Sequence, residues 1–395
     1  MHTAPLRSLH TPHFDVPPPL TLYVHIPWCV RKCPYCDFNS HEAKGNIPEE
    51  AYLAALERDL EAALPQVWGR RVHSVFFGGG TPSLLSAAGL DHLLTRLRTL
   101  LPIEPLAEVT LEANPGTFEI EKFRGFKEAG INRLSIGIQS FNPVHLQSLG
   151  RIHDDQEARR AVEIALSTFD NVNLDLMYGL PGQRLEQALA DIECAINFGV
   201  QHISAYHLTL EPNTLFHAQP PQLPDDDSTA TMQCAIEERL AAAGYAHYET
   251  SAFAQKHRAC QHNLNYWQFG DYLGIGAGAH SKLTTQDGVL RQMRYKQPKA
   301  YMEQAIAGQA IQEQHTVPAD ELGFEFMMNA LRLNAGFPVA LFQAQTGLPL
   351  QVIERPLQAA EARGLILRDP ARIQPTALGQ RFLNDLLQML LKESA

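Results

Sequence analysis

Six short apolar runs alternate with helical patterns between residues 21 and about 245, and this alternation constrains the fold more than any other feature. The runs that we predict as strands cover residues 21–26, 72–77, 107–113, 133–139, 172–179 and 202–208. Between the first two runs, Leu53, Leu56, Leu60 and Leu64 recur at helical spacing, and Asp154 suits the N-cap of a later helix. Repetition of strand and helix predicts an α/β fold with a parallel sheet, either an incomplete (β/α)6 barrel or an open sheet.

Polar or glycine-rich segments occur at or near the ends of five of these runs. Three cysteines follow the first run, "GGGTP" (78–82) follows the second, and Glu112 lies in the third. Gln139 ends the fourth run, and Asp175 lies near the end of the fifth. Because ligands of parallel α/β folds bind at the carboxyl ends of the strands, these segments predict one shared ligand site.

Composition and charge narrow the class of protein. The chain has 395 residues, of which 45% are hydrophobic and 19% charged, as in soluble globular proteins of two to three domains. A formal charge of −11 argues against a broad phosphate-binding surface, so we expect no nucleic-acid partner. The first twenty residues lack a signal-peptide core, and no later window is apolar enough to span a membrane. We therefore expect a cytoplasmic protein, with residues 1–20 as a flexible N-terminal arm and 21–245 as the partial barrel.

The alternation stops near residue 245. Residues 246–315 are rich in His, Tyr and Gly without a helical period, and we expect them to close the open side of the barrel. Residues 316–395 read as three helices, a short β-ribbon and a further helix, which resembles a winged-helix module. From residue 318 onward, seven Lys or Arg stand against eight Asp or Glu, so we predict an accessory domain rather than a DNA-binding one.

Cysteines at positions 29, 33 and 36 form the only cysteine cluster of the sequence. Disulfides explain it poorly, because the other three cysteines are scattered and no export signal is present. Structural zinc needs four ligands, and His25 and His41 flank the cluster from the wrong sides of a predicted strand. A redox pair of Cys33 and Cys36 would leave Cys29 unexplained. A [4Fe–4S] cluster with three thiolate ligands explains the count and leaves one iron free.

The C-x3-C-x2-C spacing resembles the signature of the radical S-adenosylmethionine (SAM) superfamily. That resemblance implies that Cys29, Cys33 and Cys36 hold a [4Fe–4S] cluster, that its free iron binds SAM, and that an electron donor reduces it. Longer segments such as "LYVHIPWCVRKCPYCDFNS", "EANPGT" and "NLDLMYGLPGQ" resemble the oxygen-independent coproporphyrinogen III oxidase family and its relatives. This closer resemblance implies SAM contacts at Tyr23, Tyr35, Gly79, Gly80, Thr81, Glu112, Gln139, Arg151 and Asp175.

Two features resemble the HemW branch of that family, which comprises heme chaperones. Oxidases carry a fourth cysteine where this chain has Phe38, and their N-terminal segment is longer. "CQHNLNYW" (260–267) contains H-N-x-x-Y-W, the proposed heme-binding signature of the branch. The resemblance implies that heme is cargo for acceptor proteins, for example membrane-associated respiratory enzymes. Cys260 and His280 are further candidate heme ligands.

Residue chemistry alone leaves the motif open. His262 offers an imidazole to iron, Tyr266 and Trp267 offer flat faces to a porphyrin, and Asn263 offers a hydrogen bond to a propionate. The alternative is that the aromatic stretch only closes the barrel. Two other functions also stay open, namely a genuine oxidase that makes protoporphyrinogen IX and a degenerate relative whose cluster is only structural.

Overall fold

The computed structural model describes residues 11–117 and 120–391. Half of the predicted N-terminal arm, residues 1–10, lies outside them. Residues 11–19 form no helix or strand, and His13 and Phe14 among them contact the C-terminal part of the chain. The backbone N–H of His13 donates to the carbonyl of Gly347 at 2.9 Å, and Phe14 packs against the C-terminal core.

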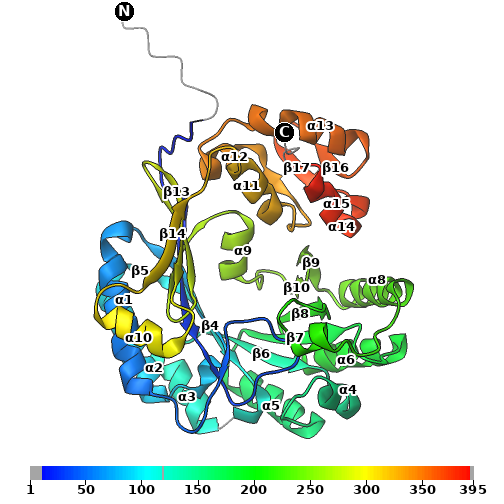
Figure 1. The fold of residues 1–395 in the computed structure, drawn as a ribbon. Helices are drawn as coiled ribbons and strands as arrows, with labels where there is room; N and C mark the ends of the chain where they lie inside the picture. The colour runs from blue at the N-terminus through cyan, green and yellow to red at the C-terminus, as the bar shows by residue number, and fades with distance from the viewer. Residues whose placement is uncertain (1–10, 118–119, 392–395) are drawn as a thin grey trace, which may run out of the picture.

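A twisted sheet with a parallel centre forms the middle of the molecule (Figure 1). All six predicted strands are present, as β1 Leu20–Ile26, β4 Val72–Gly79, β5 Ile103–Ala113, β6 Arg133–Gln139, β7 Val172–Tyr178 and β8 His202–His207. They lie side by side in this order and run parallel. A seventh parallel strand, β11 Asp271–Ile275, pairs with the outer side of β1. Five short antiparallel strands extend the sheet, namely β12 His280–Thr285, β13 Gly288–Arg294 and β14 Ile311–Thr316 beyond β11, and β10 Ala252–Ala254 and β9 Ala246–Glu249 beyond β8.

Helices cover the outer face of the sheet (Figure 1). They are α1 Glu49–Val67, α2 Ala87–Leu100, α3 Ile120–Ala129, α4 Pro143–Ser148, α5 Asp155–Thr168, α6 Leu185–Phe198 and α8 Asp226–Ala242. The short α7 Leu215–Ala218 instead lies beside the loop after β1, where the backbone N–H of Phe216 donates to the carbonyl of Pro34 at 3.0 Å. In α1, the predicted apolar positions Leu53, Leu56 and Leu60 are buried. Asp154 caps α5 as predicted, and together with Glu157 it forms a capping box. The expected α/β partial barrel is confirmed.

Residues 246–315 contain a helix that the sequence pattern did not indicate. Gln261–Trp267 form α9, although the sequence around them shows no helical period. Seven residues make fewer than two turns, which is too short for an apolar periodicity to emerge. A further helix, α10 Pro298–Ile306, packs against α1.

The C-terminal part has its own hydrophobic core, in which Phe326 packs edge-on against Phe337 and Phe342. The predicted order is confirmed, with α11 Leu322–Ala330, α12 Val339–Thr346, α13 Glu354–Ala362, a ribbon of β16 Ile366–Arg368 and β17 Arg372–Pro375, then α14 Ala377–Arg381 and α15 Leu383–Gln388. A two-residue strand, β15 Phe337–Pro338, completes a small sheet with the ribbon. Within residues 11–117 and 120–391, no helix combines the length and apolarity needed to cross a membrane.

Candidate functional site

The loop after β1 carries the three clustered cysteines over the carboxyl ends of the strands. Two short parallel strands, β2 Trp28–Cys29 and β3 His41–Glu42, pin the two ends of the loop together. Cys29, Cys33 and Cys36 are free, partly buried thiols, and all three line one cavity of about 150 Å³. The fold thus brings the predicted iron ligands to one side of a single cavity.

The donor set of this loop fits a [4Fe–4S] cluster. Each thiolate of such a cluster binds a different iron, whereas the ligands of a single ion must converge on one point. In the part of the chain that the structure describes, no three His, Cys, Asp or Glu side chains converge in that way. Arg151 Nη1 donates to Cys33 Sγ at 3.5 Å. Burial raises the pKa of Cys29 and Cys36, so metal binding there must displace thiol protons.

Arg151 is fixed by further hydrogen bonds. Its Nη2 donates to Asn114 Oδ1 at 2.6 Å and to the carbonyl of Gly137 at 2.7 Å. Asn114 in turn donates to Thr81 Oγ1 at 2.8 Å. Arg151 and Asn114 line the cavity, whereas Thr81 is buried and lies outside its lining.

Glycines at the end of β4 form part of the wall of the cavity that the cysteines line, and two of them must be glycine. Gly79 has φ +115°, and a Cβ there would lie 2.5 Å from the His25 ring. A Cβ on Gly80 would lie 2.5 Å from the carbonyl oxygen of Trp28. The backbone itself therefore lines the cavity at both positions.

Two partly exposed carboxylates, Glu112 on β5 and Asp175 on β7, lie on the same cavity. Burial, reinforced by the repulsion of Asp175, raises the pKa of Glu112 to about 8. Burial also raises the pKa of Asp175, although Asn173 Nδ2 and Ser135 Oγ donate to it at 2.8 and 3.1 Å. Such a pair favours a ligand that brings positive charge or hydroxyl groups.

Gln139 ends β6 in a conformation that side chains rarely adopt. Its φ is +68°, and the register of β6 against β7 shifts between Gly137 and Gln139. Such backbone strain concentrates at ligand sites, because surrounding contacts must hold it in place. Gln139 and Tyr35 both line the cavity. Tyr23 lies outside the lining, and its hydroxyl is 3.0 Å from His25 Nδ1.

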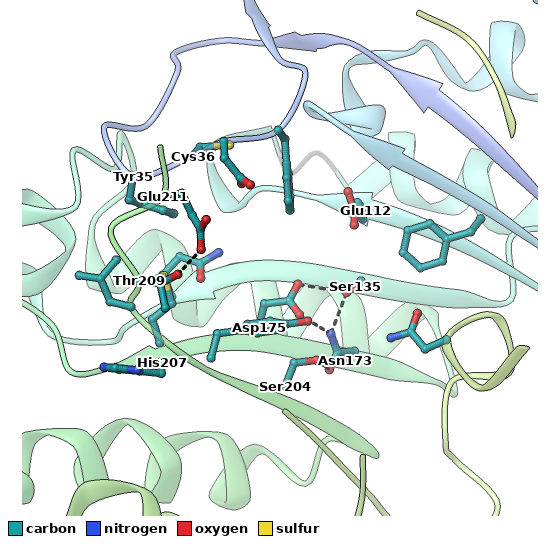
Figure 2. A pocket seen from close by; sticks show the side chains of 18 of the residues that line it. Tyr35, Cys36, Glu112, Ser135, Asn173, Asp175, Ser204, His207, Thr209 and Glu211 are labelled. Atoms are coloured by element: carbon teal, nitrogen blue, oxygen red, sulfur yellow. Dashed lines mark hydrogen bonds between the residues drawn. The ribbon is translucent and has the colours of Figure 1, made fainter. Parts of the chain in front are cut away.

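A larger cavity of about 370 Å³ adjoins the first and extends into the barrel (Figure 2). The two cavities share the lining residues Tyr35, Cys36, Phe38, Glu112, Ser135, Gln139 and Asp175. Deeper in, the larger one is lined by Phe76, Arg133, Asn173, Ser204 and Tyr206 among others. It also reaches Asn263, the one residue of the H-N-x-x-Y-W motif in its lining.

Helix α9, which carries that motif, lies near the amino ends of the strands. Asn265 Nδ2 is 3.2 Å from Thr21 Oγ1 at the start of β1, and His262 Nδ1 is 3.0 Å from Ser74 Oγ on β4. Ser74 lies five residues before Gly79, which corresponds to about 16 Å along a strand. The barrel interior therefore separates the motif from the cysteine loop.

The other candidate heme residues differ in their surroundings. Tyr266 packs edge-on against His262, with 5.1 Å between ring centroids. Arg332 lies 4.3 Å above the Trp267 ring, whose Nε1 has no hydrogen-bond partner among the described residues. Cys260 is buried, and its Sγ donates to Glu108 at 3.4 Å. His280 is exposed on β12.

Several polar residues that line the two cavities were not predicted from the sequence. Four of them, Asn114, Arg133, Ser135 and Asn173, illustrate why. Three of them lie within predicted apolar strands, where a polar residue in a parallel sheet is itself a signal of function. Asn114 follows directly on β5, at the rim where ligands bind.

Comparison with known proteins assigns the family. Residues 23–195 match the model of the radical SAM superfamily, and residues 317–382 match that of the HemN C-terminal domain. The heme chaperone HemW of Escherichia coli K12 is 48% identical over 378 residues, which cover 95% of this chain and 99% of the relative. The chain belongs to the HemW family. Radical SAM domains hold a [4Fe–4S] cluster and SAM, so the family of the chain is one in which both are present.

Other HemW proteins are similar along the same length. The relative from Haemophilus influenzae is 48% identical, and the one from Bacillus subtilis is 34% identical over 94% of this chain. Among solved structures, the coproporphyrinogen III oxidase HemN from Escherichia coli superposes with a TM-score of 0.80. It covers 95% of this chain and 90% of its own, at 24% identity. At that identity the likeness confirms the fold and carries no assignment of activity.

Proposed function

We propose that this HemW-family protein is a heme chaperone that binds heme at α9 and passes it to acceptor proteins. In the same proposal, Cys29, Cys33 and Cys36 hold a [4Fe–4S] cluster that supplies an electron to SAM. The family relationship supports the heme function. The observation that supports a heme site at α9 is that Nε2 of His262 is buried and has no hydrogen-bond partner among the described residues.

His262 has the chemistry of an iron ligand. Its Nδ1 is 3.0 Å from Ser74 Oγ, while Nε2 is buried without a hydrogen-bond partner among the described residues. Burial, with the charge of Arg133, lowers the pKa of His262 to about 3, so the imidazole is neutral at physiological pH. When Nδ1 carries the proton and donates to Ser74, Nε2 presents the free lone pair that heme iron needs.

Packing around His262 sets a condition on heme binding. The side chain is buried between Phe76, stacked at 4.9 Å, and Tyr266. Iron therefore reaches Nε2 only when these rings or α9 move. Helix α9 has no capping side chain of its own, and Glu108 of β5 instead accepts the backbone N–H of Gln261 at 2.9 Å.

The cavity lining supports a SAM site beside the cysteines. Gly79 and Gly80 offer backbone groups at close approach, and Glu112 and Asp175 suit the amine and the ribose hydroxyls. We include Tyr35, Gln139 and Arg151 in the same proposed site, because they line the cavity. The proposed partners are an electron donor for the cluster and heme-accepting proteins, such as membrane-associated respiratory enzymes.

Anaerobic reconstitution followed by two parallel assays tests this proposal. When heme is titrated into the wild-type protein, we expect the Soret band of the heme to shift. In the second assay, we expect coproporphyrinogen III to remain unconverted in the presence of SAM and a reductant. His262→Ala should weaken heme binding by about tenfold or more, because an axial iron ligand is lost. His92→Ala, on the exposed face of α2, is the matched control and should bind heme like wild type. Formation of protoporphyrinogen IX would instead identify an oxidase, and unchanged heme affinity in His262→Ala would exclude this ligand.

A further inference from the structure

Arg133, the first residue of β6, is a buried cation on the larger cavity. Its side chain is 2% exposed, yet it belongs to the cavity lining. Among the described residues, its Nε has no hydrogen-bond partner. The nearest ion-pair partner, Glu108 Oε2, lies 4.0 Å away, beyond hydrogen-bonding distance. A buried guanidinium with an unused donor is costly unless a ligand completes its hydrogen bonds.

The acids around Arg133 have other partners. Glu108 Oε1 accepts from the backbone of Gln261, at the start of α9. Asp175 accepts from Asn173 and Ser135, and Glu112 accepts from the backbone N–H of Gly79 at 3.1 Å. The charge of Arg133 helps to offset these carboxylates, but none of them meets its guanidinium in the bidentate geometry that Arg and carboxylate prefer. The N–H donors of the Arg133 guanidinium are therefore available to an external carboxylate.

We infer that Arg133 is an anion-binding residue at the inner end of the larger cavity, and that it takes a propionate of the porphyrin cargo. This inference rests on the proposed heme function. Asn263 of the H-N-x-x-Y-W motif lines the same cavity, so a porphyrin held at α9 has a path toward Arg133. A volume of about 370 Å³ is near the lower end for small-molecule sites, so it suits an edge of the macrocycle rather than the whole.

A second source of a carboxylate exists at this site, namely the methionine part of SAM. SAM belongs beside the cysteine loop, whereas Arg133 starts its strand at the opposite end from Gln139. That separation favours the porphyrin. The experiment below distinguishes the two sources.

The test compares heme with its dimethyl ester, which lacks free propionates, by absorbance titration of the cluster-reconstituted protein in one buffer. A buried charge-assisted pair predicts that wild type binds heme about 10-fold to 100-fold more tightly than the ester. Arg133→Gln should remove most of this preference, and Arg133→Lys, which keeps the charge, should retain part of it. Arg294→Gln is the matched control, because Arg294 is equally buried but pairs with Asp59 and lies outside the cavity.

Each outcome is decisive. Equal affinity of wild type for heme and ester would overturn the assignment of Arg133 while leaving heme binding intact. An equal loss of preference in Arg294→Gln would show a general effect of removing a buried cation, which also overturns the assignment. If Arg133→Gln weakens SAM binding but keeps the preference for heme over its ester, the carboxylate belongs to SAM and our inference is wrong. Failure of wild type to bind heme at all would refute the proposed function itself. If Arg133→Gln does not fold, the preference for heme over its dimethyl ester, compared between wild type and Arg133→Lys, still tests the assignment of Arg133.

Discussion

Glu112 gives a prediction in which stability and ligand binding move in opposite directions. Burial and the neighbouring Asp175 raise the pKa of Glu112 from 4.5 to about 8. A carboxyl group with a raised folded-state pKa contributes full stability below pH 4.5, where both states are protonated. That stability is lost as the pH rises toward 8, because the unfolded state releases its proton first. We therefore expect Glu112→Gln to stabilise the ligand-free protein at neutral and alkaline pH.

The size of this stability effect follows from the difference between the pKa values of Glu112 in the unfolded and folded states. Each tenfold difference in proton affinity is worth about 1.4 kcal/mol, so the full effect of Glu112 is about 5 kcal/mol above pH 8 and about 3.4 kcal/mol at pH 7. Glu112 is partly exposed to the cavity, where water screens the charge, so we take about half of these values. Glutamine can keep the 3.1 Å bond from the backbone N–H of Gly79, which limits the damage of the substitution.

Urea unfolding of the cluster-free, reduced protein between pH 5 and 9 measures the effect. Glu112→Gln should raise the free energy of unfolding by about 1.5 kcal/mol at pH 7, more at pH 8 and little at pH 5. The exposed Glu163→Gln on α5 should change it at none of these pH values. In the reconstituted protein, the same Glu112→Gln variant should bind SAM about tenfold more weakly, because a charge-assisted hydrogen bond is lost. A variant that is no more stable than wild type at pH 8 would refute the reasoning about the buried carboxyl pair.

Two further predictions concern the glycine wall and the heme motif. Gly79→Ala should cost more than about 2 kcal/mol of unfolding free energy and abolish SAM binding, because its Cβ would clash with His25 at a φ of +115°. The control is Gly308→Ala, where φ is +75° and the space around the Cβ is open. This variant should lose only about 1 kcal/mol and bind SAM normally. Ser74→Ala should weaken heme binding about tenfold while the protein stays folded, because His262 loses the partner that orients its ring. Equal destabilisation by both glycine variants in urea unfolding, or unchanged heme affinity in the serine variant, would contradict these predictions.

The strand and helix pattern was readable because its signals are local. Each predicted strand is a short run of mostly apolar, mostly buried residues in the parallel sheet, and Asp154 lies three residues from its capping partner Glu157. Residues 246–315 were harder, because their strands are short and two of them, β10 and β11, pair with strands far away in the chain. β11, for example, joins the parallel sheet beside β1, about 250 residues earlier in the chain. Only tertiary pairing makes such a segment a central strand.

The residues of the candidate site likewise fall into those that the sequence predicted and those that it did not. Cys29, Cys33 and Cys36 lie on one loop, and the end of β4 follows at the next strand, so the rule for parallel sheets predicted their common edge. Arg133 escaped prediction, because an arginine at the start of an apolar strand normally points to solvent. The fold instead turns it into the barrel interior, where its charge becomes significant.

The sequence alone determined the alternation of strands and helices over residues 21–245, the spacing of the thiols and the glycines that a tight wall requires, since each depends on residues close together in the chain. The tertiary structure decided what surrounds the heme motif. His262 meets Ser74 across 188 residues, and Glu108 supports the start of α9 from 153 residues away. No local pattern encodes these contacts, because they exist only when the strands of the barrel lie side by side.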